Sequence, residues 1–132
     1  MGTSEFDEAY EDEPGRHERE EGSLGQAILE ATIEDLEPKP AATLREMGTI
    51  RAAVHLMLEQ KLGAVLVERD GQTVGIFTER DLMRRVVAAG IDLDRAIEEV
   101  MTPEPETLRL DDRVAFALNR MAVGGFRNVP IV

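Results

Sequence analysis

The chain has 132 residues, which suffices for one small domain or for two very small modules that share a core. It contains no cysteine, so disulfides and thiolate metal sites are excluded, and no apolar run approaches the roughly 20 residues that span a bilayer. The net charge is −12 and basic residues are not clustered, so we expect neither nucleic acid nor a membrane as a partner, and a cytoplasmic location.

The negative charge is concentrated at the N-terminus. Residues 1–22 hold nine acidic residues and two arginines, and they contain almost no aliphatic side chains. Such a segment cannot bury enough apolar surface to offset the entropy that it would lose on ordering. We therefore predict a disordered acidic tail over residues 1–22, followed by the folded part of the chain.

Strand and helix patterns alternate after this tail. The predicted elements, in chain order, are a strand at 41–44, a helix over about 50–61, strands at 63–68 and 73–78, and a helix from Leu82 that ends near Gly90. Thr49 is an N-cap candidate for the first helix. Asp70-Gly71 is typical of a two-residue hairpin and is expected to join the two later strands. A linker with a short helix follows, for which Asp94 is a candidate cap.

The second half of the chain repeats the first at a shift of 64 residues. Identical residues recur across this shift, namely Ile33/Ile97, Glu34/Glu98, Thr43/Thr107, Leu44/Leu108 and Arg45/Arg109. The apolar spacing of the helix at 50–58 also returns at 114–122, again on one face of an amphipathic helix. The pattern indicates a tandem duplication, and the second copy predicts a strand, a helix and a strand that lies within FRNVPIV.

The second copy of the repeat is shorter than the first. A turn, a strand and a helix like those at 70–89 are expected after Val132, and without them a strand edge stays unpaired. We therefore expect the second copy to be partial, and the chain to be a fragment of a longer protein.

Three motifs resemble those of a known family. They are VGIFTERD at 74–81, the hinge EVMTP at 99–103 and GFRNVP at 125–130. Together they make residues 30–132 similar to a pair of CBS domains, an arrangement known as a Bateman module. The resemblance implies an α/β (α+β) fold in which each copy is a small β-sheet packed against two helices, with a pseudo-two-fold axis between the copies. It divides the folded part into a first CBS domain at 23–92, and a linker with a partial second CBS domain at 93–132.

The resemblance also implies a function. Such pairs are regulatory modules that typically bind adenine nucleotides or related adenosyl ligands in clefts between the two copies. We therefore expect AMP, ADP, ATP or S-adenosylmethionine as a possible regulatory ligand, and no obligatory cofactor. A homodimer and an unknown regulated protein are the expected protein partners.

The ligand site that the resemblance implies combines residues of both copies. Thr78 would contact phosphate or ribose, and Asp81 would accept hydrogen bonds from the ribose diol. The second copy would supply Thr107 and Leu108 near the base, and Arg127, Asn128, Val129 and Pro130 along the following strand, with Arg127 toward phosphate. Arg80 is left open between a ligand contact and a solvated helix residue. The symmetric cleft would need the Thr-x-x-Asp motif of the second copy, which by the repeat is expected after Val132.

The Thr78-x-x-Asp81 spacing has two interpretations from the residues alone. A hydroxyl at a helix start, beside unpaired backbone N–H groups, suits a phosphate. The same spacing is typical of a capping box, in which the two side chains only close the first helical turn. The two roles are compatible, so both stay open.

Enzymatic chemistry has little support in the sequence. His17 and His55 are far apart and are expected on the surface, and no Walker-type or dinucleotide-binding glycine pattern occurs. We therefore predict no catalytic residues, no metal site and no enzyme activity. The alternative to a ligand sensor is a structural module that dimerises or docks a partner protein without binding any ligand.

Overall fold

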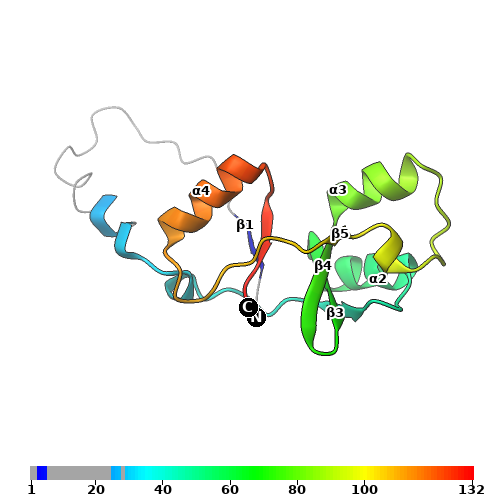
Figure 1. Cartoon of the computed structure of the whole chain (residues 1–132), viewed down its shortest axis with the longest axis horizontal. Helices are drawn as coiled ribbons and strands as arrows, with labels where there is room; N and C mark the ends of the chain where they lie inside the picture. Colours follow the sequence, from blue (N-terminus) through cyan, green and yellow to red (C-terminus); the bar gives the residue numbers. More distant parts are fainter. Residues whose placement is uncertain (1–2, 6–24, 28) are drawn as a thin grey trace.

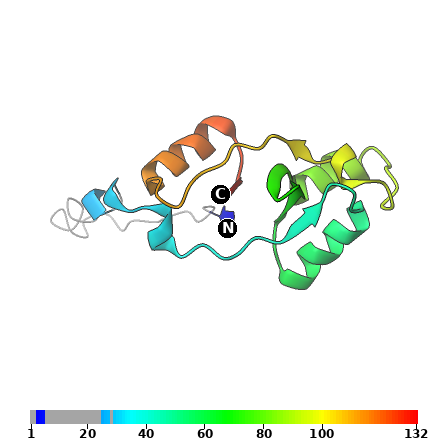
Figure 2. The same cartoon turned by 60° about the horizontal axis from the view of Figure 1, so that its bottom comes forward.

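The computed structural model describes residues 3–5, 25–27 and 29–132, and these form two lobes (Figure 1). Two extended connections run between the lobes, one after residue 36 and one after residue 103 (Figure 2). The first lobe contains β2 (Thr43–Arg45), α2 (Ile50–Gln60), β3 (Ala64–Arg69), β4 (Gln72–Thr78), α3 (Glu79–Asp81) with its π-helical continuation η2 (Leu82–Val87), the short 3-10 helix η3 (Ile97–Glu99) and β5 (Thr102–Pro103). The second lobe contains the 3-10 helix η1 (Ile33–Leu36), α4 (Val114–Gly124), β6 (Asn128–Pro130) and β1 (Thr3–Glu5). The predicted mixed α+β architecture is confirmed.

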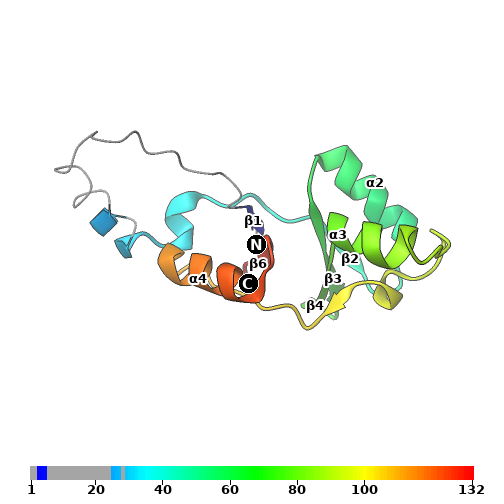
Figure 3. The ribbon, with the colours of Figure 1, turned by 90° about the horizontal axis from the view of Figure 1, so that it is seen from above.

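The first lobe is built on a four-stranded sheet in the order β2-β3-β4-β5. β2 runs parallel to β3, whereas β3/β4 and β4/β5 are antiparallel. Asp70 and Gly71 join β3 to β4 with φ angles of 51° and 78°, both in the left-handed region that a two-residue hairpin requires. The helices α2 and α3 lie on one side of this sheet, and the second lobe lies on the other side (Figure 3).

Helix α2 follows its predicted bounds closely. Thr49 is the N-cap, and its hydroxyl accepts a hydrogen bond of 3.1 Å from the backbone N–H of Ala52. The short helix in the linker differs from its prediction. It begins at Ile97 after Ala96, and Asp94 does not cap it, because its carboxylate pairs with the Arg51 guanidinium of α2 at 2.9 Å.

Each lobe has its own hydrophobic core, and the leading segment of each copy packs in the core of the other. Ile33 precedes the first lobe in the sequence, yet it is fully buried in the second core beside Val129 and Ile131. Ile97 leads the second copy and is fully buried in the first core, with Phe77 among its members. Because the two cores exchange these segments, folding of one lobe depends on the position of the other.

The second lobe has less sheet than the repeat predicts. The expected strand around Thr107 and Leu108 is reduced to one parallel bridge between Leu108 and Ile131. The neighbouring β6 has only three residues, so few ladder hydrogen bonds are available to a longer partner strand.

β1 bears on the predicted disorder of residues 1–22. Thr3–Glu5 pairs antiparallel with β6, so these three residues depart from the prediction. The physical reason is that an open strand edge carries unpaired backbone groups that accept another strand. Residues 6–22 lie outside the described residues. Within the described part of the chain, no helix has the length and apolar character needed to cross a bilayer.

The exchange of segments predicts that Ile33 stabilises the second lobe. Ile33→Ala removes a fully buried side chain and is expected to lower the free energy of unfolding by about 2–5 kcal/mol. The control is Leu36→Ala in the same short helix, where the side chain is 44% exposed and the expected loss is under about 1 kcal/mol. Urea unfolding followed by circular dichroism measures both. Equal losses for the two variants would contradict the exchange.

Candidate functional site

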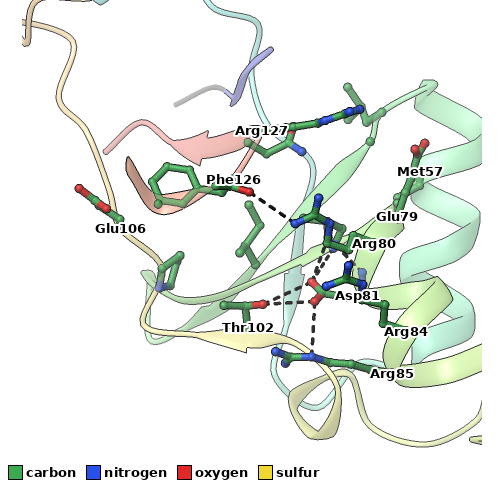
Figure 4. Close-up of a pocket in the computed structure, with 18 of the residues that line it drawn as sticks. Met57, Glu79, Arg80, Asp81, Arg84, Arg85, Thr102, Glu106, Phe126 and Arg127 are labelled. Carbon is green, nitrogen blue, oxygen red and sulfur yellow. Dashed lines mark hydrogen bonds and ion pairs between the residues drawn. The ribbon is translucent and has the colours of Figure 1, made fainter. Parts of the chain in front are cut away.

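A cavity of about 1130 Å³ opens between the two lobes (Figure 4). The first lobe contributes the end of α2, the end of β4 and the helix that starts with α3. The second lobe contributes the end of α4 and the start of β6, and the connecting segment after β5 closes one side. The main polar residues on its walls are Lys61, Thr78, Glu79, Arg80, Asp81, Arg84, Arg85, Thr102, Glu106, Arg127 and Asn128.

Thr78 and Asp81 form the capping box that their spacing predicts. The backbone N–H of Asp81 donates to Thr78 Oγ1 at 3.2 Å, and the backbone N–H of Thr78 donates to Asp81 Oδ2 at 3.0 Å. The Thr78 hydroxyl also donates to Asp81 Oδ2 at 3.1 Å. These bonds satisfy donors that the first turn of a helix would otherwise leave unpaired, which fixes where β4 ends and α3 begins.

Asp81 is 6% exposed and has partners beyond the cap. The Thr102 hydroxyl donates to Asp81 Oδ1 at 3.3 Å, and Arg85 Nε lies 3.6 Å from the same oxygen. A buried carboxylate needs such partners, because an unpaired charge away from water is costly. The residue is therefore held by its own helix, by the preceding strand and by the connecting segment.

The cavity is basic although the chain as a whole has a net charge of −12. Five basic side chains line it against three acidic ones. Arg80 donates to the backbone carbonyl of Gly125 at 3.4 Å, which joins the two lobes, and Arg85 donates to the carbonyl of Met101 at 2.8 Å. Within the described part of the chain, the side chains of Lys61, Arg84 and Arg127 have no hydrogen-bond or ion-pair partner. Their charge is available to an anion in the cavity.

The structure brings five of the nine predicted site residues to this cavity: Thr78, Arg80, Asp81, Arg127 and Asn128. The other four do not line it. Thr107 is exposed elsewhere, and Leu108, Val129 and Pro130 are buried. The physical reason is that the small second lobe uses Leu108 and Val129 to fill its own core, next to which Pro130 follows in β6.

Sequence reasoning missed several residues of the cavity wall. Arg84 lies one helical turn beyond Asp81, so the (i, i+3) spacing was a usable signal for it. Phe126 packs against Gly124, where a Cβ would come 2.1 Å from its ring, so a larger residue at that position would displace the ring. Thr102 lies in the EVMTP hinge motif, but no sequence signal placed it at the cavity, because its contact with Asp81 joins residues 21 positions apart.

One histidine, His55, lies in the part of the chain that the structure describes. His55 is exposed on α2, and no group of three histidine, aspartate or glutamate side chains there is arranged to hold a metal ion. His17 lies outside the described residues.

The carboxylate of Glu106 borders the cavity and pairs with Arg120 of α4. The hydrogen bond from the Arg120 guanidinium lowers the pKa of Glu106 below its usual value, so this carboxylate stays charged at neutral pH. The paired Arg120 compensates this charge, so Glu106 does not offset the unpaired basic side chains on the other walls of the cavity.

Comparisons with known proteins agree with this architecture. A family model described as "CBS domain" matches residues 33–88. The meiotically up-regulated gene 70 protein of Schizosaccharomyces pombe is 41% identical over 85 residues, which cover 64% of this chain and 12% of that protein. This chain therefore spans only a small part of that curated relative.

Two solved structures are similar over most of their length. A CBS-domain-containing protein from Agrobacterium tumefaciens is 29% identical, with a TM-score of 0.70 over 76% of this chain and 85% of that chain. A CBS domain protein from Pyrobaculum aerophilum, complexed with AMP, is 26% identical, with a TM-score of 0.71 over 77% of this chain and 79% of that chain.

The capping box predicts that Asp81 contributes to stability as well as to the cavity wall. Asp81→Ala leaves the Thr78 N–H without its partner and is expected to lower the free energy of unfolding by about 1–3 kcal/mol. The matched control is Glu79→Ala in the same turn, where the exposed side chain is expected to contribute less than about 1 kcal/mol. Thermal and urea unfolding measure the free energy of unfolding of both variants. An unchanged value for Asp81→Ala would show that the capping box does not stabilise the fold.

Proposed function

We propose that this chain, which is a CBS-domain protein with the fold of a CBS pair, is a regulatory module that binds an adenine nucleotide or a related adenosyl ligand in the cavity between its lobes. The observation that carries the proposal is the basic cavity of an acidic protein. Lys61, Arg84 and Arg127 face it without partners among the described residues, so a phosphate group would find uncompensated positive charge there. The related structure that holds AMP supports a nucleotide as the source of that phosphate.

Thr78 and Asp81 suit the sugar of such a ligand. A carboxylate offers about four lone-pair positions. Asp81 Oδ2 accepts from Thr78 twice, at 3.0 and 3.1 Å, whereas Oδ1 has one hydroxyl donor at 3.3 Å and a more distant guanidinium at 3.6 Å. Oδ1 therefore keeps capacity for a ribose hydroxyl while the capping box stays intact. In this proposal Arg84 and Arg127 take the phosphate, and Asn128 lies beside them.

A ligand in this position would act on the relation between the lobes. Both lobes line the cavity, and Arg80 of α3 donates to Gly125 at the end of α4 across it. A ligand shifts an equilibrium only as far as its affinities for the two states differ. An anion that pairs with the Arg80 guanidinium would bind more tightly to a state in which Arg80 has released the carbonyl of Gly125, which supplies such a difference. The regulated protein would then respond to the changed arrangement of the lobes.

The alternative function, a structural module that dimerises or docks a protein, also has an observation in its favour. Large apolar side chains are exposed along the three main helices, namely Leu58, Met83, Val87, Phe116 and Val123. Exposed apolar side chains on helices provide surface that a protein partner can bury. A homodimer through these helices is compatible with ligand binding, so this function adds to the first one unless the cavity proves empty of any ligand.

Ligand binding is tested by thermal unfolding with AMP, ADP, ATP and S-adenosylmethionine. A ligand at 100 times its dissociation constant adds about 2.7 kcal/mol to the free energy of unfolding, so the melting temperature should rise for at least one of them. Arg127→Ala is expected to weaken a phosphate-bearing ligand by about tenfold, because it removes a charge-assisted hydrogen bond. The control is Arg45→Ala, an exposed arginine outside the cavity, which should leave the affinity unchanged. No shift with any ligand would leave only the structural function.

The dimer is tested by sedimentation of the full chain. Val87→Asp places a charge at a helix position where the side chain is 62% exposed, and is expected to convert a dimer to a monomer while the far-ultraviolet circular dichroism of the chain stays unchanged. A wild-type chain that sediments as a monomer at all concentrations would contradict the homodimer.

A further inference from the structure

Asp81 and Arg85 belong to one helix and contact two adjacent residues, Met101 and Thr102, of the segment that connects the copies. Asp81 and Arg85 lie one helical turn apart, and both face the start of β5 (Figure 4). The Arg85 guanidinium donates to the backbone carbonyl of Met101 at 2.8 Å. The Thr102 hydroxyl donates to both carboxylate oxygens of Asp81, at 3.3 and 3.5 Å. The connecting segment is therefore fixed to the helix that carries the proposed ligand carboxylate.

The packing around these contacts leaves the connecting segment little freedom. A Cβ on Gly75 of β4 would lie 2.2 Å from Met101 Sδ, so the Met101 side chain occupies the space above that glycine. Thr102 itself pairs with Ile76 in the sheet. Because backbone and neighbouring side chain are both held, the Thr102 hydroxyl stands at a fixed place relative to Asp81.

The orientation of the Asp81 carboxylate needs a partner outside the capping box. The terminal torsion of an aspartate is broad, so the side chain by itself does not fix the plane of its two oxygens. The capping bonds hold Oδ2, and Arg85 approaches Oδ1 only to 3.6 Å. Thr102 supplies the shortest hydrogen bond to Oδ1 among the described residues. The direction in which Oδ1 presents its remaining lone pair to the cavity thus depends on Thr102.

We propose that Thr102 is a positioning residue for Asp81, which makes the segment between the copies a part of the ligand site. The inference rests on the proposed function above and deepens it. Ribose recognition at Asp81 requires the Thr102 hydroxyl, although that hydroxyl does not itself contact the ligand. Movement of the connecting segment and occupation of the Asp81 site are coupled through this one hydrogen bond, because Thr102 belongs to the first and orients the second.

The test compares Thr102→Val, which keeps the shape and removes the hydroxyl, with Thr102→Ser, which keeps the hydroxyl. With AMP as the probe, Thr102→Val is expected to raise the dissociation constant about 5- to 10-fold, and Thr102→Ser to stay within about twofold of wild type. With 2′,3′-dideoxy-AMP, which lacks the ribose diol, both variants should bind as the wild-type chain does. Thermal unfolding of each ligand-free variant accompanies the titrations.

Two results would overturn the proposal for Thr102. One is an unchanged AMP affinity in Thr102→Val, and the other is an equal loss for AMP and its dideoxy analogue, which would indicate a general distortion. A second measurement needs no ligand. The side-chain carboxyl carbon resonance of Asp81 should move in Thr102→Val and not in Thr102→Ser, and no movement would contradict the positioning role. If the wild-type chain binds none of AMP, ADP, ATP and S-adenosylmethionine, the proposed function fails, and this resonance still decides whether Thr102 positions Asp81.

Discussion

The arrangement of this protein depends on one nearly buried carboxylate. Asp81 joins the end of β4, the first turn of α3 and the start of β5, because its oxygens accept hydrogen bonds from Thr78 and Thr102. A charge at this depth is tolerated only while such donors stay in place. The strand, the helix and the connecting segment are therefore held in one geometry, and that geometry forms a wall of the cavity.

The exchange of leading segments couples the two lobes in a second way. Ile33 lies in the second core and Ile97 in the first, so each connection between the lobes follows a buried apolar side chain. Small cores give a low free energy of unfolding, so loss of one of these buried side chains removes a large fraction of it. The exchanged segments thus hold the two lobes side by side, with the cavity between them.

The chain as a whole is negatively charged, whereas the wall of the cavity is positively charged. The chain carries −12 overall, whereas Lys61, Arg84 and Arg127 leave the cavity with uncompensated positive charge. Acidic surroundings weaken the binding of anions elsewhere on the molecule and leave the cavity as the favourable place for them. This contrast favours a phosphate-bearing ligand, and the carboxylate of Asp81 next to it favours a sugar over a simple inorganic anion.

The sequence by itself determined the features that depend on neighbouring residues. These include the cap of α2 by Thr49, the hairpin at Asp70-Gly71 and the capping box of Thr78 and Asp81, because each obeys a rule of local backbone geometry. The tandem repeat also predicted the family and the mixed fold. Only the tertiary structure decided that Asp94 pairs with Arg51 and does not cap, that Leu108 and Val129 fill a core, and that Thr102 reaches Asp81. Those outcomes join residues far apart in the chain, and they follow from the close packing of the lobes, which no local pattern encodes.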